Sequence, residues 1–116
     1  MSKYRGADPS PELVRAARVS DVPAGGMVCV EIDRRDVVLV NLDGRLYALE
    51  CNCPHNGGPL GRGALDSCEG RLMCPWHCWT WDVRTGRAIM PPVSYRVATY
   101  EVRVDGDDIL VSRVPR

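Results

Sequence analysis

The sequence has no excess of charge of either sign. Fifteen Lys and Arg residues balance fifteen Asp and Glu residues, so the formal net charge of the 116-residue chain is zero at pH 7. Proteins that bind DNA or RNA carry a basic surface that neutralises phosphates, and the composition predicts none here. The sequence also contains no polybasic run that would attract a membrane surface. These absences argue against a nucleic-acid-binding module and against a membrane partner.

Long apolar runs are missing as well. No window approaches the ~20 apolar residues of a membrane span. Residues 1–12 are polar and contain no apolar core of a signal peptide. We therefore expect a cytoplasmic protein, in which cysteines serve metal or redox chemistry more often than disulfides.

Histidine is scarce, and its placement is informative. The chain has two histidines, His55 and His77, and six cysteines. Both histidines, all three tryptophans and five of the six cysteines fall within residues 51–92, a segment rich in glycine and proline. Such a segment cannot build much of a core from its own side chains. We expect a bound metal centre to hold it together.

The remaining sequence predicts an all-β fold. Asp43-Gly44 has the signature of a tight hairpin turn, because both positions tolerate a positive φ. Around residues 98–104 the alternation predicts one face with Ala98, Tyr100, Val102 and Val104, and a wet face with Thr99, Glu101 and Arg103. Runs rich in Val, Ile, Leu and Tyr predict strands at residues 28–32, 37–42, 45–49, 71–74, 97–104 and 109–112. The continuously apolar run at 37–42 predicts a central strand that is covered on both sides.

The length fits one domain, since single domains cluster at roughly 100–150 residues. Residues 1–12 lack apolar periodicity and predict a flexible N-terminal arm. Residues 13–116 then form the domain, with a β base from 13–50 and 93–116 and an inserted subdomain from 51–92.

Two half-sites in the insert carry the chemistry. Cys53-x-His55 and Cys74-x-x-His77 are separated by eighteen residues, and each offers one thiolate and one imidazole. A proline follows the cysteine in each half-site and stiffens the turn. Glycines after the first half-site let backbone amides approach a buried anion. These four side chains are the candidate metal ligands.

This pattern resembles the Rieske [2Fe–2S] family, whose motif is C-x-H, a spacer of similar length, and C-x-x-H. The strings CPHNGGPLGRG and MCPWHCWTWDVRTG carry the resemblance. The Pro91-Pro92 pair stands where the family places a proline-containing loop over its cluster. The resemblance implies an antiparallel β sandwich or barrel as the base of a Rieske domain. It also makes residues 51–92 the cluster-binding subdomain, with one [2Fe–2S] cluster per chain.

The resemblance further implies how the ligands and partners are arranged. Cys53 and Cys74 would bind one iron, and His55 and His77 the other. The chain would be a Rieske-type ferredoxin, a one-electron carrier between a flavoprotein reductase and a terminal oxygenase of a ring-hydroxylating dioxygenase-like system. It would not be catalytic alone, and both partners would dock transiently near His55 and His77.

Departures from the high-potential branch of the family predict a low reduction potential. That branch has a disulfide between its cluster loops, where this chain has Gly58 and Trp76. It also uses serine and tyrosine hydroxyls as donors to the cluster, where this chain has Trp79 and Trp81. Fewer hydroxyl donors stabilise the reduced cluster less. We expect a midpoint toward the bottom of the roughly −150 to +300 mV Rieske range.

Two alternatives stay open. One is the small Rieske subunit of a larger oxidoreductase such as a nitrite reductase. The other is a zinc-stabilised interaction module, because zinc also accepts two cysteines and two histidines. Zinc fingers normally pair cysteine with cysteine and histidine with histidine, whereas each half-site here is mixed.

The other cysteines are not expected to bind metal. Cys29 lies in a predicted strand, and we expect a small buried side chain there. Cys51 and Cys78 flank the site and are expected to be free thiols, with a Cys51–Cys78 bridge as the alternative. Cys68 lies in a polar turn and should be exposed. Trp76, between two ligands, should be partly exposed for docking, while the other two tryptophans shield the cluster from water or pack the insert onto the base.

Overall fold

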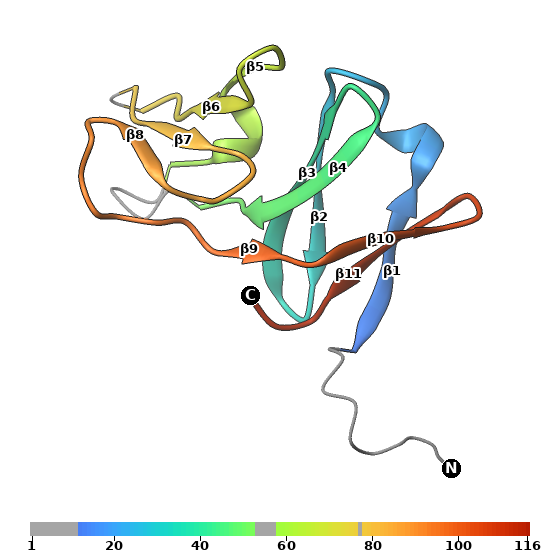
Figure 1. Ribbon diagram of the computed structural model, residues 1–116. Helices are drawn as coiled ribbons and strands as arrows, with labels where there is room; N and C mark the ends of the chain where they lie inside the picture. Colours follow the sequence, from blue (N-terminus) through green and yellow to red (C-terminus); the bar gives the residue numbers. More distant parts are fainter. Residues whose placement is uncertain (1–11, 53–57, 77) are drawn as a thin grey trace.

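The computed structural model describes residues 12–52, 58–76 and 78–116 (Figure 1). The predicted all-β class is confirmed, because the described residues form antiparallel sheets with two short 3-10 turns, η1 (Val19–Asp21) and η2 (Leu60–Arg62). No helix in this part of the chain is long and apolar enough to cross a bilayer. The arm expected at residues 1–12 lies outside the described residues, apart from Glu12.

The base contains two sheets. The middle sheet has the order β2-β3-β4-β9, and the outer sheet has the order β1-β11-β10. The middle sheet comprises β2 (Met27–Ile32), β3 (Arg35–Leu42), β4 (Arg45–Glu50) and β9 (Thr99–Tyr100). The outer sheet comprises β1 (Leu13–Arg18), β10 (Val102–Asp105) and β11 (Asp108–Ser112). Figure 1 shows the middle sheet between the outer sheet and the rest of the molecule.

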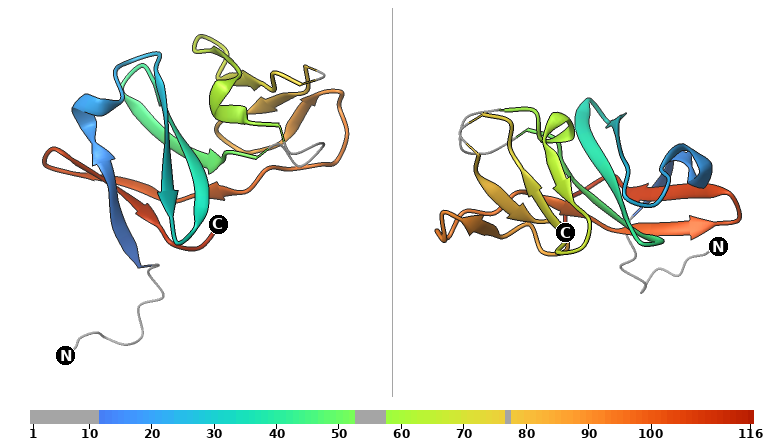
Figure 2. Two further views of the ribbon diagram at one scale, coloured as in Figure 1. Left: turned by 180° about the vertical axis from the view of Figure 1, so that it is seen from behind. Right: turned by 90° about the horizontal axis from the view of Figure 1, so that it is seen from above.

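The third sheet, called here the small sheet, is a meander of four strands in the order β5-β6-β7-β8. Its strands are β5 (Ala64–Asp66), β6 (Arg71–Met73), β7 (Thr80–Asp82) and β8 (Ala88–Met90). Each strand is three residues long. The two views in Figure 2 place this sheet on the side of the middle sheet that faces away from β1, β10 and β11.

Strand β3 separates two hydrophobic cores. Its residues from Val37 to Leu42 are all buried, which confirms the central strand that the apolar run predicted. Because side chains alternate along a strand, Val38 and Val40 pack toward the small sheet, in one cluster with Leu72 and Trp81. On the opposite face, Val37 and Leu39 pack with Tyr100, Ile109 and Val111.

The chain changes sheets at Glu101, and the single strand predicted for residues 97–104 is wrong. Thr99 pairs with Leu49 in the middle sheet, whereas Val102 pairs with Val111 in the outer sheet. The Ser112 hydroxyl accepts a hydrogen bond from the Glu101 amide at 3.0 Å and so fixes the break. The predicted faces fail for the same reason.

Two burial values show the failure of the predicted faces. Thr99, assigned to the wet face, is 7% exposed, and Val104, assigned to the apolar face, is 53% exposed. Alternation holds only within one sheet, so it does not continue through Glu101.

Tight turns fix the register of the middle sheet. Asp43 and Gly44 have φ values of 55° and 96°, which confirms the predicted hairpin turn. Buried Asn41 supports this turn: its Oδ1 accepts from the Gly44 amide at 2.7 Å, and its Nδ2 donates to the Val22 carbonyl at 2.7 Å.

Candidate metal centre

The described residues on either side of the first half-site are joined by backbone contacts. The Leu60 amide donates to the Cys51 carbonyl at 2.6 Å, and Asn52 forms an isolated bridge with Pro59. The Cys51 amide donates to the Asp36 carbonyl at 2.8 Å. The start of this loop, which we call the first cluster loop (residues 51–60), is therefore anchored to β3.

The second half-site begins where β6 ends. The Cys74 amide donates to the Trp79 carbonyl at 2.7 Å and closes the turn between β6 and β7. Cys78 has a φ of 61°, a left-handed conformation that is uncommon for a residue with a side chain. The Thr80 hydroxyl donates to the Cys78 carbonyl at 3.3 Å. The described residues on both sides of His77 are thus held by backbone hydrogen bonds.

Of the four predicted ligands, only Cys74 is among the described residues. It is fully buried, in the core cluster that contains Leu72 and Trp81. Cys53, His55 and His77 lie outside the described residues, so the ligand set stays a prediction. Within residues 12–52, 58–76 and 78–116, no three Asp, Glu, His or Cys side chains gather as a competing metal site.

A buried hydrogen-bond donor lies in the same core as Cys74. Trp81 is fully buried, and its Nε1–H has no acceptor among the described residues. A buried indole N–H normally finds a partner, and an unpaired buried donor costs roughly 1–3 kcal/mol. The sulfur atoms of an iron–sulfur cluster and its thiolate ligands accept hydrogen bonds. The donor set therefore fits such a group beside Cys74.

The prediction from sequence missed this donor, because it considered hydroxyl groups only. Its expectation that Trp81 packs the insert onto the base is confirmed, since Trp81 packs in one core with Val38 and Val40 of β3. Trp79 is partly buried and lies 5.8 Å from Trp81 between ring centroids.

Exposed apolar side chains lie in the second half-site, at the end of β8 and on the loop that follows it. Trp76 is 51% exposed, as expected for a docking residue. Met90, Val93 and Tyr95 are exposed as well, and the Tyr95 ring stacks on Trp79 with 5.5 Å between centroids. We call these four side chains (Trp76, Met90, Val93 and Tyr95) the apolar rim. Of these four, only Trp76 was predicted to be a docking residue, because the stacking of Tyr95 on Trp79 has no local sequence signal.

The prediction that the Cys29 side chain is buried is wrong. Cys29 is exposed because β2 is an edge strand of the middle sheet. Its Sγ lies 3.1 Å from the Cys51 Sγ. Desolvation of the sulfur, together with the hydrogen bond to Cys51, raises the pKa of the Cys29 thiol to about 12. Cys29 therefore keeps its proton at neutral pH.

The remaining cysteines agree with expectation. Cys51 and Cys78 are free thiols, so the alternative Cys51–Cys78 bridge is not formed, and Cys68 is exposed.

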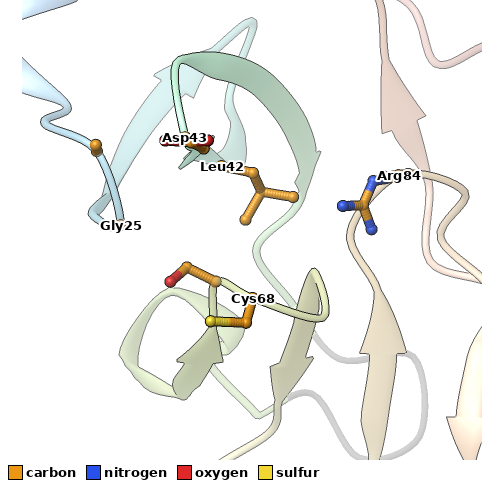
Figure 3. A pocket seen from close by; sticks show the side chains of 7 residues that line it. Gly25, Leu42, Asp43, Cys68 and Arg84 are labelled. Atoms are coloured by element: carbon orange, nitrogen blue, oxygen red, sulfur yellow. The ribbon is translucent and has the colours of Figure 1, made fainter.

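An open cavity of about 470 Å³ lies between the base and the turns of the small sheet. Figure 3 shows residues from four separate turns around it, among them Gly25, Asp43, Cys68 and Arg84. The Arg84 Nη1 donates to the Glu69 carbonyl at 3.2 Å, so part of the hydrogen-bonding capacity of this guanidinium is used to hold the turn after β5. Cys74, the predicted ligand among the described residues, does not line the cavity, and we assign no part of the metal centre to it.

Comparison with known proteins agrees with this geometry. Residues 12–101 match the family model of the Rieske [2Fe–2S] domain. The 3-phenylpropionate/cinnamic acid dioxygenase ferredoxin subunit of Shigella flexneri serotype 5b (strain 8401) is 32% identical over 99 residues, which cover 84% of this chain and 91% of that protein. The ferredoxin component of a naphthalene 1,2-dioxygenase system from Pseudomonas aeruginosa is 29% identical over 98 residues, which cover 84% of this chain and 92% of that protein.

A solved structure shows the same fold. The ferredoxin of carbazole 1,9a-dioxygenase from Nocardioides aromaticivorans IC177 superposes with a TM-score of 0.83 at 31% identity. The match covers 88% of this chain and 98% of that one. The chain thus belongs to the Rieske [2Fe–2S] domain family, among relatives that are ferredoxin components of dioxygenase systems.

Proposed function

We propose that this chain is a Rieske-type ferredoxin that carries single electrons from a flavoprotein reductase to a terminal oxygenase. The observation that carries the proposal is the match along nearly the full length of proteins named as ferredoxin components of dioxygenase systems. The sequence has no nucleotide-binding glycine loop. A carrier that is not catalytic alone fits these features.

The proposed ligands are Cys53, His55, Cys74 and His77, which would hold one cluster per chain with the cysteines on one iron and the histidines on the other. When bound, the [2Fe–2S] cluster supplies one-electron redox chemistry. The protein excludes water on the Cys74 side of the site, since Cys74 is fully buried among apolar side chains. It also contributes the Trp81 Nε1–H, which is the described donor left without an acceptor.

We propose the apolar rim as the docking face. Its four side chains are exposed by 42–60% and offer apolar surface that a docked partner would cover. Trp76 belongs to the second half-site itself, and Tyr95 stacks on Trp79, which follows that half-site. Small, transient interfaces suit a carrier that must leave one partner before it meets the next.

Family membership favours this proposal over a zinc-stabilised module, and the names of the relatives favour a free carrier over a subunit of a larger oxidoreductase. The experiment is to purify the chain anaerobically and measure iron, acid-labile sulfide and zinc. We expect about two iron atoms per chain and a rhombic EPR signal after reduction.

Matched variants identify the ligands. His77→Ala should remove the EPR signal and the visible spectrum, whereas Cys68→Ser should leave both unchanged, because Cys68 is an exposed thiol outside the ligand set. Zinc in place of iron, or an unchanged spectrum in His77→Ala, would overturn the proposal.

A further inference from the structure

Two thiols outside the proposed ligand set lie in direct contact. Cys29 is on the edge strand β2, and Cys51 follows β4 at the start of the first cluster loop. Their Sγ atoms are 3.1 Å apart. A disulfide bond is about 2.05 Å long, so the sulfurs need to approach by only about 1 Å to form one.

The packing around the pair leaves room for this contact. Gly61 of η2 lies directly over both sulfurs: a Cβ at this position would be 2.0 Å from the Cys29 Sγ and 3.2 Å from the Cys51 Sγ. Only glycine fits here without displacing the thiols. The two cysteines differ in access, because Cys29 is exposed while Cys51 is 6% exposed.

Cys51 is also the residue through which the first cluster loop is anchored. Its amide donates to the Asp36 carbonyl, and its carbonyl accepts from the Leu60 amide. A bond from Cys51 to Cys29 would therefore connect this anchor point to a second strand, β2, which forms no backbone hydrogen bond with the loop in the described part of the chain.

We propose that Cys29 and Cys51 form a reversible dithiol–disulfide pair, a modification site that low-molecular-weight disulfides such as glutathione disulfide oxidise. In the first step the Cys29 sulfur attacks one glutathione sulfur, and one glutathione leaves with a proton as the free thiol. In the second step the Cys51 sulfur attacks the Cys29 sulfur of the mixed disulfide, and the second glutathione leaves as a thiol. The protein loses two electrons and two protons, and glutathione disulfide gains them.

Formation of this bond has two physical consequences. It closes a loop between residues 29 and 51 and so reduces the freedom of the unfolded chain, which raises the melting temperature of the oxidised form. It also restrains the anchor of the first cluster loop. Because the pKa of Cys29 is raised to about 12, thiolate is rare at neutral pH and the exchange is slow. The test is therefore made at equilibrium and not on a rate.

The experiment uses the full chain, incubated anaerobically to equilibrium in glutathione buffers of increasing disulfide-to-thiol ratio, then alkylated, digested and analysed by mass spectrometry. We expect a Cys29–Cys51 cross-linked peptide that grows with the ratio and disappears again in excess glutathione. Cys68→Ser, which removes another exposed thiol, should keep the cross-link, and Cys29→Ser should lose it together with the rise in melting temperature.

The proposal is overturned if Cys29 stops at the glutathione mixed disulfide, stays unmodified, or cross-links to Cys68 or Cys78 instead. The pair does not rest on the proposed electron-carrier function. The visible spectrum, recorded on the same samples, reports the cluster separately, so a cross-link without iron would contradict the carrier and leave the thiol pair standing.

Discussion

The base and the small sheet are both built of antiparallel strands, yet different forces hold them. In the middle sheet, β2, β3 and β4 are six to eight residues long and bury side chains on both faces of β3. In the small sheet every strand has three residues, too few to form a core of its own. The small sheet therefore depends on its contact with β3 and, in the proposed function, on the cluster.

The small sheet depends on the base for its burial, whereas the base does not depend on the small sheet. The cluster of Val37, Leu39, Ile109 and Val111 lies on the far side of β3 and includes no residue of the small sheet. Leu72 and Trp81 of the small sheet, in contrast, are buried in a core only because Val38 and Val40 of β3 pack against them. Damage to the small sheet should leave the base folded, and a weakened base should still support the small sheet until the whole domain unfolds.

The largest expected effect comes from the matched pair Leu72→Ala and Ile109→Ala, one in each core. Both residues are fully buried, so each substitution should lower the free energy of unfolding by about 2–5 kcal/mol. Leu72→Ala should lose the visible spectrum before the far-UV circular dichroism in a urea titration, whereas Ile109→Ala should lose both together. If the visible spectrum and the far-UV circular dichroism were lost in the same order in both variants, the base and the small sheet would not unfold as separate regions.

A second substitution tests the junction between the regions. Gly61→Ala should destabilise the fold by about 1–3 kcal/mol, because its Cβ would lie 2.0 Å from the Cys29 Sγ. Urea denaturation of Gly61→Ala, Cys29→Ala and the double variant measures how strongly the two substitutions are coupled in their effect on the free energy of unfolding. Cys29→Ala should restore part of the loss in the double variant, since it removes the colliding sulfur. Simple additivity of the two single effects would mean that this contact is not the cause.

Trp81→Phe tests the donor that the small sheet supplies. Removal of a hydrogen bond of about 0.5–1.5 kcal/mol to a cluster or ligand sulfur should lower the midpoint potential by roughly 20–65 mV. We expect the wild-type midpoint itself near the bottom of the roughly −150 to +300 mV Rieske range. Spectroelectrochemical titration checks both values, with Trp79→Phe as the aromatic control. An equal shift in both variants would point to packing and not to the buried N–H.

The smallest expected effect near neutral pH is a pH dependence of the folding stability that comes from the Cys29 thiol. The pKa of the Cys29 thiol rises from 9.0 to about 12 on folding, so between these values the unfolded chain loses a proton that the folded chain keeps. Stability is therefore complete below pH 9 and falls as the pH rises toward 12. The difference in melting temperature between wild type and Cys29→Ala should stay constant below pH 9. Above pH 9 the melting temperature of wild type should fall more steeply than that of Cys29→Ala. Parallel curves would contradict the raised pKa.

Prediction from sequence succeeded where the physical signal is local. The apolar run of β3 and the Asp43-Gly44 turn depend on neighbouring residues only, and both are confirmed. The spacing of Cys53, His55, Cys74 and His77 indicated a family whose membership the comparisons show. Of these four residues the described structure places Cys74, in a fully buried position after β6.

Prediction failed where the signal depends on the rest of the fold. Strands β5, β7 and β8 are too short to show alternation, and β1 is interrupted by arginines, so none was predicted. The exposure of Cys29 follows from the edge position of β2, which only the strand order reveals. The contact between Cys29 and Cys51 joins residues 22 positions apart and has no local pattern.

The central claim is that the protein is a one-electron carrier, and an anaerobic reductive titration of the purified chain tests it most directly. Dithionite should deliver one electron per chain, with the EPR signal rising in proportion and the visible spectrum returning fully on reoxidation. If a chain that retains its metal took up no electron from dithionite, the claim would be contradicted.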